Sequence, residues 1–301
     1  MGQSAGAASV HYLTASPLAK GLFIRAIAQS GADVRQGPGE TLAQAEQNGA
    51  GFAQAKGAAS LAALRAMPAA EIIAPVSGGF RFLPIVDGRF LPKSVDELFA
   101  TGEQSDVPTL TGWDADEGSF NADYGKASGE EFRNQTRQRV GALADEILKL
   151  YPAATEAVAV DSQKALARDL SMASTYVWAV RRAKTSKTKV YTYVFTHPQP
   201  GPTQDRYMAF HSSELPYVFN NLNQSNRPWT AEDWKIAETM SGYWVNFIAT
   251  GDPNGKGLPE WPAFSEASAV TMELGDKMGP RPIADREKFD LLKKLLAGPG
   301  H

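Results

Sequence analysis

Residues 2–10 read GQSAGAASV, and the first five of them match the pattern G-x-S-x-G. In this pattern a sharp turn between a strand and a helix exposes the hydroxyl of the central serine, here Ser4. Gly2 and Gly6 carry no side chains, so the strand and the helix can approach the strained backbone at Ser4. Five residues alone predict little, because an ordinary Gly/Ser loop matches the same pattern. The rest of the chain must supply the partners of a catalytic serine.

Apolar runs and helical patterns alternate along the chain. Short buried strands are predicted at residues 23–32, 107–111 and 190–196. Helices are predicted at residues 7–13, 142–152, 161–184 and 230–251. Strands that alternate with helices indicate an α/β fold. No internal repeat or linker separates these elements, so we expect residues 1–301 to form a single domain.

Local signals mark the ends of several elements. Thr230 is the predicted N-cap of the helix at 230–251, which Gly251 ends. Residues 41–69 are rich in Ala, Gln and Glu and predict surface helices. Three glycines are expected to break these helices: Gly49, Gly51 and Gly57. The Asp-Gly pair in PIVDGRFLP (84–92) predicts a tight turn that joins two short strands.

Composition excludes several classes of protein. The 301 residues are 43% hydrophobic and 21% charged, which is the balance of a globular protein. With 30 basic and 33 acidic residues the formal charge is −3, so a nucleic-acid partner is not expected. The absence of cysteine excludes disulfides, thiolate metal sites and cysteine catalysis. No run approaches the ~20 apolar residues of a membrane span.

The chain has four histidines, so the search for a base that activates Ser4 is short. His301 is the terminal residue, and His11 would point away from Ser4 along the predicted helix. His197 follows a strand in a proline-rich loop, where a structural or solvent-facing role is expected. His211 lies in YMAFHSSELPYVF beside a polar Ser-Ser-Glu run and is the best candidate. A lone histidine of this kind is more often structural, which leaves that alternative open.

A carboxylate must hold such a histidine in the correct tautomer. Asp114, Asp116 and Glu117 follow the predicted strand at 107–111, where an α/β-hydrolase places its acid. The resulting order is serine, acid, histidine. It is the order of α/β-hydrolases and differs from that of chymotrypsin-like and subtilisin-like enzymes. Composition does not choose among the three carboxylates.

Several segments, in order, resemble the type-B carboxylesterases, the family that includes cholinesterases and bacterial para-nitrobenzyl esterases. They are GQSAGAASV, AIAQSGA, VDGRFLP, TGWDADEGSF, FHSSELPYVFN and WVNFIATGDPN followed by WPAF. TGWDADEGSF is similar to the family's G-x-x-x-D-E-G-x-x-F segment, with Phe120 one position early. The resemblance implies an α/β-hydrolase fold, with a mostly parallel sheet flanked by helices.

The resemblance also implies roles for individual residues. Ser4 corresponds to the family's nucleophile, Glu117 to its acid and His211 to its base. This correspondence selects Glu117 over Asp116. Ala5, which follows the serine, would supply one backbone N–H to the oxyanion hole.

Three more residues are expected around these groups: Gln3, Ser30 and Asp116. Ser30 lies in the QSG run, where a buried structural serine is nearly as good an interpretation. Gln3 stands where cholinesterases carry a glutamate close to the cationic choline group. A neutral amide there favours an uncharged ester with a modest acyl chain.

The sequence also departs from the family pattern. In the family a long N-terminal portion, with several strands and a Gly-Gly oxyanion loop, precedes the serine turn. Here Met1 stands directly before that turn, so we expect this chain to be the C-terminal part of the family domain. Loss of one oxyanion donor typically costs about 10²–10³ in rate. We therefore expect the isolated chain to be poorly folded and weakly active or inactive.

The resemblance predicts a serine carboxylesterase that hydrolyses small uncharged carboxylic esters through an acyl-enzyme. Two alternatives stay open: a non-catalytic cholinesterase-like binding protein or inactive fragment, and the same triad acting on amides, carbamates or lactones. No cofactor is expected, and no metal, because His211 and Glu214 lack a third ligand at a useful spacing. The oligomeric state is not predicted. The compartment, cytoplasmic or secreted and periplasmic, also stays open, because a signal peptide would lie in the portion that is missing.

Overall fold

The computed structural model describes residues 1–31, 39–283 and 286–297. Within these residues six strands form the main sheet and two form a small ribbon. The strands of the main sheet are β1 (Gly2–Gln3), β2 (Ala26–Gln29), β5 (Thr109–Asp114), β6 (Val190–Phe195), β7 (Val270–Leu274) and β8 (Gly279–Pro282). The strands of the ribbon are β3 (Glu40–Thr41) and β4 (Ile85–Val86).

Twelve α-helices lie in the described part of the chain. In the first half they are α1 (Ala5–Ala15), α2 (Leu42–Ala55), α3 (Leu61–Ala66), α4 (Ala69–Ile73), α5 (Val95–Ala100), α6 (Gly129–Val140) and α7 (Ala144–Leu150). In the second half they are α8 (Glu156–Thr185), α9 (Gln204–Tyr207), α10 (Leu215–Val218), α11 (Ala231–Thr250) and α12 (Arg286–Ala297). None of the described helices is long and apolar enough to cross a membrane.

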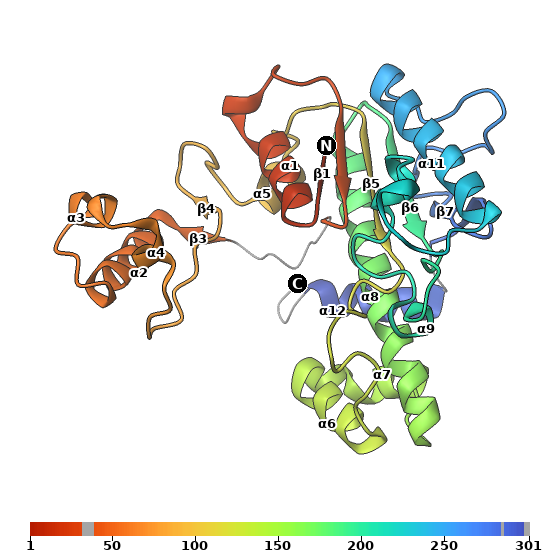
Figure 1. Cartoon of the computed structure of the whole chain (residues 1–301), viewed down its shortest axis with the longest axis horizontal. Helices are drawn as coiled ribbons and strands as arrows, with labels where there is room; N and C mark the ends of the chain where they lie inside the picture. The colour runs from red at the N-terminus through yellow and green to blue at the C-terminus, as the bar shows by residue number, and fades with distance from the viewer. Residues whose placement is uncertain (32–38, 284–285, 298–301) are drawn as a thin grey trace.

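The main sheet has the order β1-β2-β5-β6-β7-β8. Its first five strands pair in parallel, and only β8 runs antiparallel to its neighbour β7. This order confirms the predicted α/β class and its mostly parallel sheet. In parallel strands all carboxyl ends meet at one edge of the sheet, which is where open α/β sheets bind ligands. The ends of β1, β5 and β6 therefore converge on one region (Figure 1).

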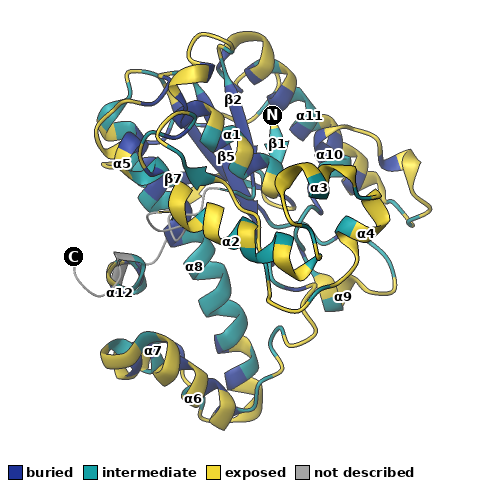
Figure 2. Cartoon of the chain, turned by 90° about the vertical axis from the view of Figure 1, so that its left-hand side faces the viewer, coloured by how far each residue is buried: buried dark blue, intermediate teal, exposed yellow. Residues whose placement is uncertain are grey.

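Both faces of the central strands are covered by helices. Tyr191, Tyr193 and Phe195 of β6 pack in a buried cluster with Trp244 of α11, whereas Val194, which points the other way, packs with residues of α5 and α8. Such two-sided burial explains why β5 and β6 are buried along their whole length, as Figure 2 shows for β5. The sheet with its two helical layers forms the rigid support of the site.

A third buried cluster lies outside this sandwich, where α6, α7, α8 and α12 meet. Its centre includes Phe132, Ile147, Tyr151 and Leu292. Figure 1 shows α6 and α7 at the far end of the long helix α8, away from the serine turn. The small ribbon and helices α2, α3 and α4 extend on another side of the sheet (Figure 1).

Most of the predicted elements are present with shifted ends. The strand expected at 107–111 is β5, Thr109–Asp114, so Asp114 ends the strand instead of following it. The helices expected at 161–184 and 230–251 are confirmed as α8 and α11. Residues 23–32 contain the buried strand β2, although residue 32 lies outside the described residues.

Two local predictions are wrong. Gly49 and Gly51 lie inside α2, because helix-favouring neighbours carry the helix through them, and only Gly57 (φ 70°) lies past its end. The Asp-Gly pair at 87–88 makes no hairpin, because β4 pairs in parallel with the distant β3. The turn itself is present: the Asp87 carboxylate accepts hydrogen bonds from the next backbone N–H groups, at residues 89–91.

The serine turn between β1 and α1 depends on close backbone approach. A Cβ on Gly2 would lie 2.3 Å from the carbonyl oxygen of Gly6, and one on Gly31 would lie 2.4 Å from Cβ of Ala7. Gly6 itself has open space where a Cβ would stand. The steric role expected of both pattern glycines therefore falls on Gly2, while Gly31 of the β2 end makes room for α1.

The N-terminus of α11 gives a test of how this layer is stabilised. Thr230 forms a capping box, since its Oγ1 accepts from the N–H of Asp233 and its own N–H donates to the Asp233 carboxylate. We expect Thr230→Ala to lower the free energy of unfolding by about 1 kcal/mol, measured by urea denaturation. Thr239→Ala, a change at a half-buried mid-helix position whose hydroxyl donates to the Lys235 carbonyl, is the control. Equal losses in both variants would contradict the role of the cap.

The glycine contacts predict a second asymmetry. We expect Gly2→Ala to push the turn away from β2, because its methyl group must displace a backbone carbonyl. Gly6→Ala meets nothing and adds helix propensity. Amide hydrogen exchange at Ser4, whose N–H donates to Gln29 O, reports the opening. Exchange should speed up about tenfold or more in Gly2→Ala, since overpacking costs roughly 1–3 kcal/mol, and should stay unchanged in Gly6→Ala. Unaltered exchange in both variants would refute this account of the turn.

Candidate active site

Ser4 lies in a strained turn at the end of β1. Its φ of 57° and ψ of −122° are values that a non-glycine residue rarely adopts, and such strain costs about 1–3 kcal/mol. The Ser4 N–H donates to the carbonyl of Gln29 over 2.9 Å, which ties the turn to β2. The side chain does not cap α1. Instead its Oγ lies 2.8 Å from Nε2 of His211.

The other ring nitrogen of His211 contacts the loop after β5. Its Nδ1 is hydrogen-bonded to Oε2 of Glu117. The second oxygen of Glu117 accepts from the backbone N–H of Asp114 over 2.9 Å, which fixes the carboxylate against the strand end. With Nδ1–H donated to Glu117, the free lone pair of Nε2 faces the Ser4 hydroxyl. The structure thus brings together the three residues expected from sequence: serine, acid and histidine.

The carboxylate changes the acid–base behaviour of the histidine. The hydrogen bond to Glu117 raises the pKa of His211 above its ordinary value of 6.5, and the charges of Glu117 and Glu214 act in the same direction. Burial opposes this shift. The His211 side chain keeps 25% of its exposure and Glu117 keeps 20%, so both groups reach the surface. A small molecule in solution can therefore approach the serine.

Asp116, the neighbour of the acid, holds the two loops together and does not contact the histidine. Its backbone N–H donates to the carbonyl of Ala209 over 2.8 Å, two residues before His211. Its buried carboxylate accepts from Arg168 and from the Tyr124 hydroxyl, at 2.5 and 2.9 Å. Because the Asp116 carboxylate is occupied by this ion pair, only its neighbour Glu117 is free to contact His211.

The other residues expected near the site differ in how closely they approach Ser4, His211 and Glu117. Gln3 is close, with its side-chain nitrogen 3.3 Å from Nε2 of His211. Ala5 begins α1, where the first N–H groups have no acceptor within the helix. Ser30 has a positive φ of 58° and a buried hydroxyl that meets no hydrogen-bond partner within the described residues. It therefore makes no hydrogen bond to Glu117.

A buried polar network under the three residues was not anticipated. The Gln29 side chain donates to Oε1 of Glu214 over 2.8 Å and accepts from the Trp244 indole over 3.1 Å. The carboxylate of Asp114 accepts from the backbone N–H of Ser212, the residue after the histidine, over 2.8 Å. The sequence feature that could have predicted this network is the presence of Gln, Asp and Glu within otherwise apolar segments.

The remaining described histidines have other surroundings. His11 packs on the Trp178 ring with centroids 5.0 Å apart, and burial, aided by the charge of Arg182, lowers its pKa to about 4. His197 bridges Asp233 and Asp276 at 2.9 and 2.5 Å, which supports the structural role expected for it. His301 lies outside the described residues. The described part of the chain holds no cluster of three or more residues suited to a metal ion.

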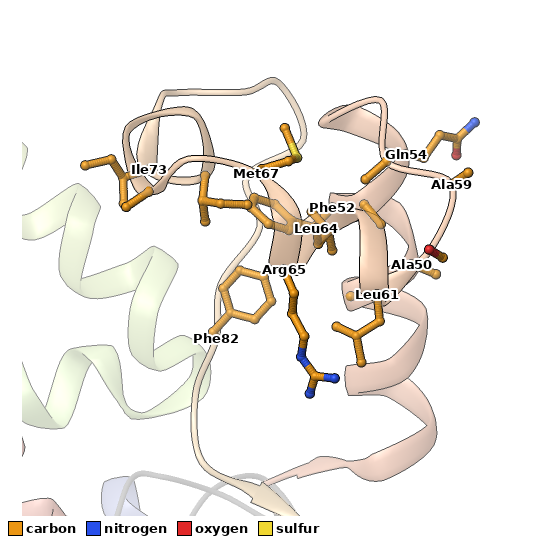
Figure 3. Close-up of a pocket in the computed structure, with 16 residues that line it drawn as sticks. Ala50, Phe52, Gln54, Ala59, Leu61, Leu64, Arg65, Met67, Ile73 and Phe82 are labelled. Carbon is orange, nitrogen blue, oxygen red and sulfur yellow. The ribbon is translucent and has the colours of Figure 1, made fainter.

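Two apolar cavities lie near α2 and α1. One, of about 890 Å³, is an open groove lined by α2, α3 and α4, and Figure 3 shows Phe52, Leu64 and Phe82 along it. The second, of about 810 Å³, extends from Ala5 and His11 of α1 to residues 82–86. Neither is lined by Ser4, Glu117 or His211. The exposed Phe120 ring lies beside the triad, with its centroid 6.1 Å from that of His211.

Comparison with known sequences agrees with this geometry. The pattern described as "Carboxylesterase family" matches residues 1–290. Para-nitrobenzyl esterase of Bacillus subtilis (strain 168) is 32% identical over 92% of this chain and 58% of its own length. Cocaine esterase of Homo sapiens is 29% identical over 96% of this chain and 56% of its own length. The chain thus spans little more than half the length of these relatives.

Comparison with solved structures gives the same assignment. Two structures of PNB esterase superpose with TM-scores of 0.73 and 0.75, both at 29% identity. They cover 96% and 97% of this chain, which matches 62% and 61% of their own chains. Sequence, sheet order and superposition agree, and this chain belongs to the carboxylesterase family and has the α/β-hydrolase fold.

Proposed function

We propose that this chain carries the catalytic triad of a serine carboxylesterase, with Ser4 as nucleophile, His211 as base and Glu117 as acid. One observation supports it above all: Ser4 Oγ lies 2.8 Å from His211 Nε2 while the opposite ring nitrogen is bonded to Glu117. A nucleophile, a base and a group that orients the base are the parts that acyl transfer requires.

In the first step His211 accepts the proton of Ser4 as Oγ attacks the ester carbonyl. The pair of electrons displaced from the carbonyl resides on its oxygen, where a backbone N–H can stabilise it. Ala5 is the residue after the nucleophile and stands at the N-terminus of α1, whose dipole favours the negative charge. The protonated His211 then gives its proton to the alcohol oxygen, the carbon–oxygen bond breaks, and the acyl group stays on Ser4.

In the second step water replaces the alcohol. His211 takes a proton from water, which attacks the acyl carbonyl, and the same proton returns to Ser4 Oγ when the carboxylic acid leaves. Glu117 stays ionised throughout and stabilises the imidazolium that forms twice. Its hydrogen bond from the Asp114 N–H holds it in place during both steps.

The class of substrate follows from the groups next to the serine. Gln3 is a neutral amide 3.3 Å from His211, so no fixed negative charge at this position attracts a cationic alcohol. We propose small uncharged carboxylic esters, which agrees with the name of the para-nitrobenzyl esterase relative. The presence of all three triad residues argues against a binding protein that has lost catalysis.

The triad also bears on the organisation of the chain. Its residues come from the ends of β1 and β5 and from the loops after β6, which belong to one sheet. Because the site exists only when these distant segments fold together, we propose that the chain forms a single α/β-hydrolase domain, the C-terminal part of the domain of its longer relatives.

Covalent labelling of Ser4 is the direct test of the proposal. The triad is assembled in the structure, so the purified 301-residue chain should slowly gain the mass of one adduct with a fluorophosphonate even though missing oxyanion donors lower its rate. The probe reacts with an activated serine and not with an ordinary hydroxyl. Ser4→Ala should gain none, and Ser9→Ala, one turn further along α1, should label like the unmodified chain. An unlabelled chain, or equal labelling of Ser4→Ala, would refute the assignment.

The pH dependence of labelling tests the base. Only neutral His211 can accept the serine proton, so the rate should rise with pH and reach half its maximum above 6.5, in the direction of the raised pKa. Glu117→Gln removes the charge that raises this pKa. We expect its midpoint to move to lower pH while the maximal rate falls roughly 10³–10⁴-fold, as for loss of a triad carboxylate. Asp123→Asn, in an exposed turn, should change neither value; an unmoved midpoint in Glu117→Gln would show that another group is the base.

A further inference from the structure

Two carboxyl groups lie fully buried under the triad and have no role in the steps described above. Asp114 ends β5, and Glu214 immediately precedes α10; both side chains have 0% exposure. The two carboxyl groups lie close enough to interact, since each is among the groups that shift the pKa of the other. Two ionised carboxylates only accept, so a hydrogen bond between them requires a proton.

The remaining contacts account for one oxygen of each group. Asp114 Oδ2 accepts from the Ser212 N–H, and Glu214 Oε1 accepts from the Gln29 side chain, each over 2.8 Å. The other two oxygens, Asp114 Oδ1 and Glu214 Oε2, meet no donor among the described residues if both acids are ionised. One proton shared between these two oxygens gives both of them a hydrogen bond. The pair then buries one negative charge instead of two, which lowers the cost of desolvation.

We propose that Asp114 and Glu214 share one proton, and that through this pair they act as positioning residues for Glu117 and His211. The inference rests on the proposed function for its catalytic consequence, but the shared proton itself does not. Asp114 is the connecting element. Its backbone N–H donates to Glu117, and its side chain accepts from the residue that follows His211.

The groups that face the pair are consistent with a single negative charge. Three titratable groups surround the pair: the buried Tyr193 hydroxyl of β6, Glu117 in the loop after β5, and His211 in the loop after β6. Gln29 of β2, which donates to Glu214, is neutral. Burial, with the charges of Glu214 and Glu117, holds the pKa of Asp114 well above its usual range, and burial also raises the pKa of Glu214. Burial likewise keeps the Tyr193 hydroxyl protonated by raising its pKa.

The shared proton makes the two acids interdependent. In Asp114→Asn the amide oxygen can accept from Ser212 and the amide nitrogen can donate to Glu214, so the hydrogen bond survives without a titratable proton. Glu214→Gln can donate to the ionised Asp114 in the same way. In the double variant both amides present N–H₂ groups to each other, and no proton arrangement satisfies them. Each single change is therefore compatible with the pair, and the combination is not.

A double-mutant cycle on the whole chain tests the shared proton by thermal melting at pH 7. We expect both single variants to melt close to the unmodified chain and the double variant to melt below either. Asp145→Asn, an exposed change of equal charge on α7, is the control. If both acids were ionised, replacing either one by its amide would remove the repulsion, and both single variants would melt well above the unmodified chain, which would overturn the proposal. Additive losses would overturn it too.

Fluorophosphonate labelling across pH tests the positioning role. We expect rates within about threefold of the unmodified chain for each single variant and at least about tenfold lower for the double variant, the scale expected for unpaired buried donors. At alkaline pH the unmodified chain should lose reactivity as the shared proton leaves, and Asp114→Asn should not. An alkaline fall that persists in Asp114→Asn would overturn the role. Absence of any adduct on the unmodified chain would refute the proposed function, whereas the melting cycle would still decide the shared proton.

Discussion

The hydrogen bonds of Gln29 connect Ser4 to the buried polar network beneath the triad. The backbone carbonyl of Gln29 accepts from the N–H of Ser4, and its side chain donates to Glu214 and accepts from Trp244. A strained residue persists only where its surroundings fix it more strongly than the strain opposes. Here the fixing group belongs to β2, a fully buried strand that pairs with β1 on one side and β5 on the other. The position of Ser4 therefore depends on the packing of β2 and not on the short strand β1 alone.

Parallel pairing of the strands brings the proposed catalytic residues to one edge of the sheet. Strands β1, β5 and β6 point the same way, so the serine turn, the acid loop and the loops that lead to the histidine emerge at one edge. Asp116 then holds the acid loop against the histidine loop through its N–H, and against α8 through its ion pair with Arg168. Three residues separated by up to 207 positions in sequence thus meet through backbone geometry and the contacts of Asp116.

Much of this could be predicted from sequence, because local chemistry sets it. The N-cap Thr230 and the C-terminal Gly251 bounded α11 correctly, and the alternation of strands and helices gave the fold class. Composition left Asp114, Asp116 and Glu117 equivalent, and only the family resemblance selected Glu117. Other features depend on tertiary contacts that no local pattern records. Gly6 matches the serine pattern yet has open space, whereas Gly31, which lies outside that pattern, is the residue pressed against α1.

The buried acids show why the rest of the site resists prediction. Asp114 and Glu117 stand three positions apart in one acidic run, but the strand extends to Asp114 and turns its side chain into the interior. Two carboxylic side chains of one short run therefore have different surroundings, one on a partly exposed loop and one buried beneath it, because solvation and not sequence sets the charge of a carboxyl group. A carboxyl kept neutral can hold neighbouring backbone groups without adding a second charge beside the imidazole. The acid–base chemistry of His211 thus depends on where β5 ends as much as on the carboxylate that the histidine contacts.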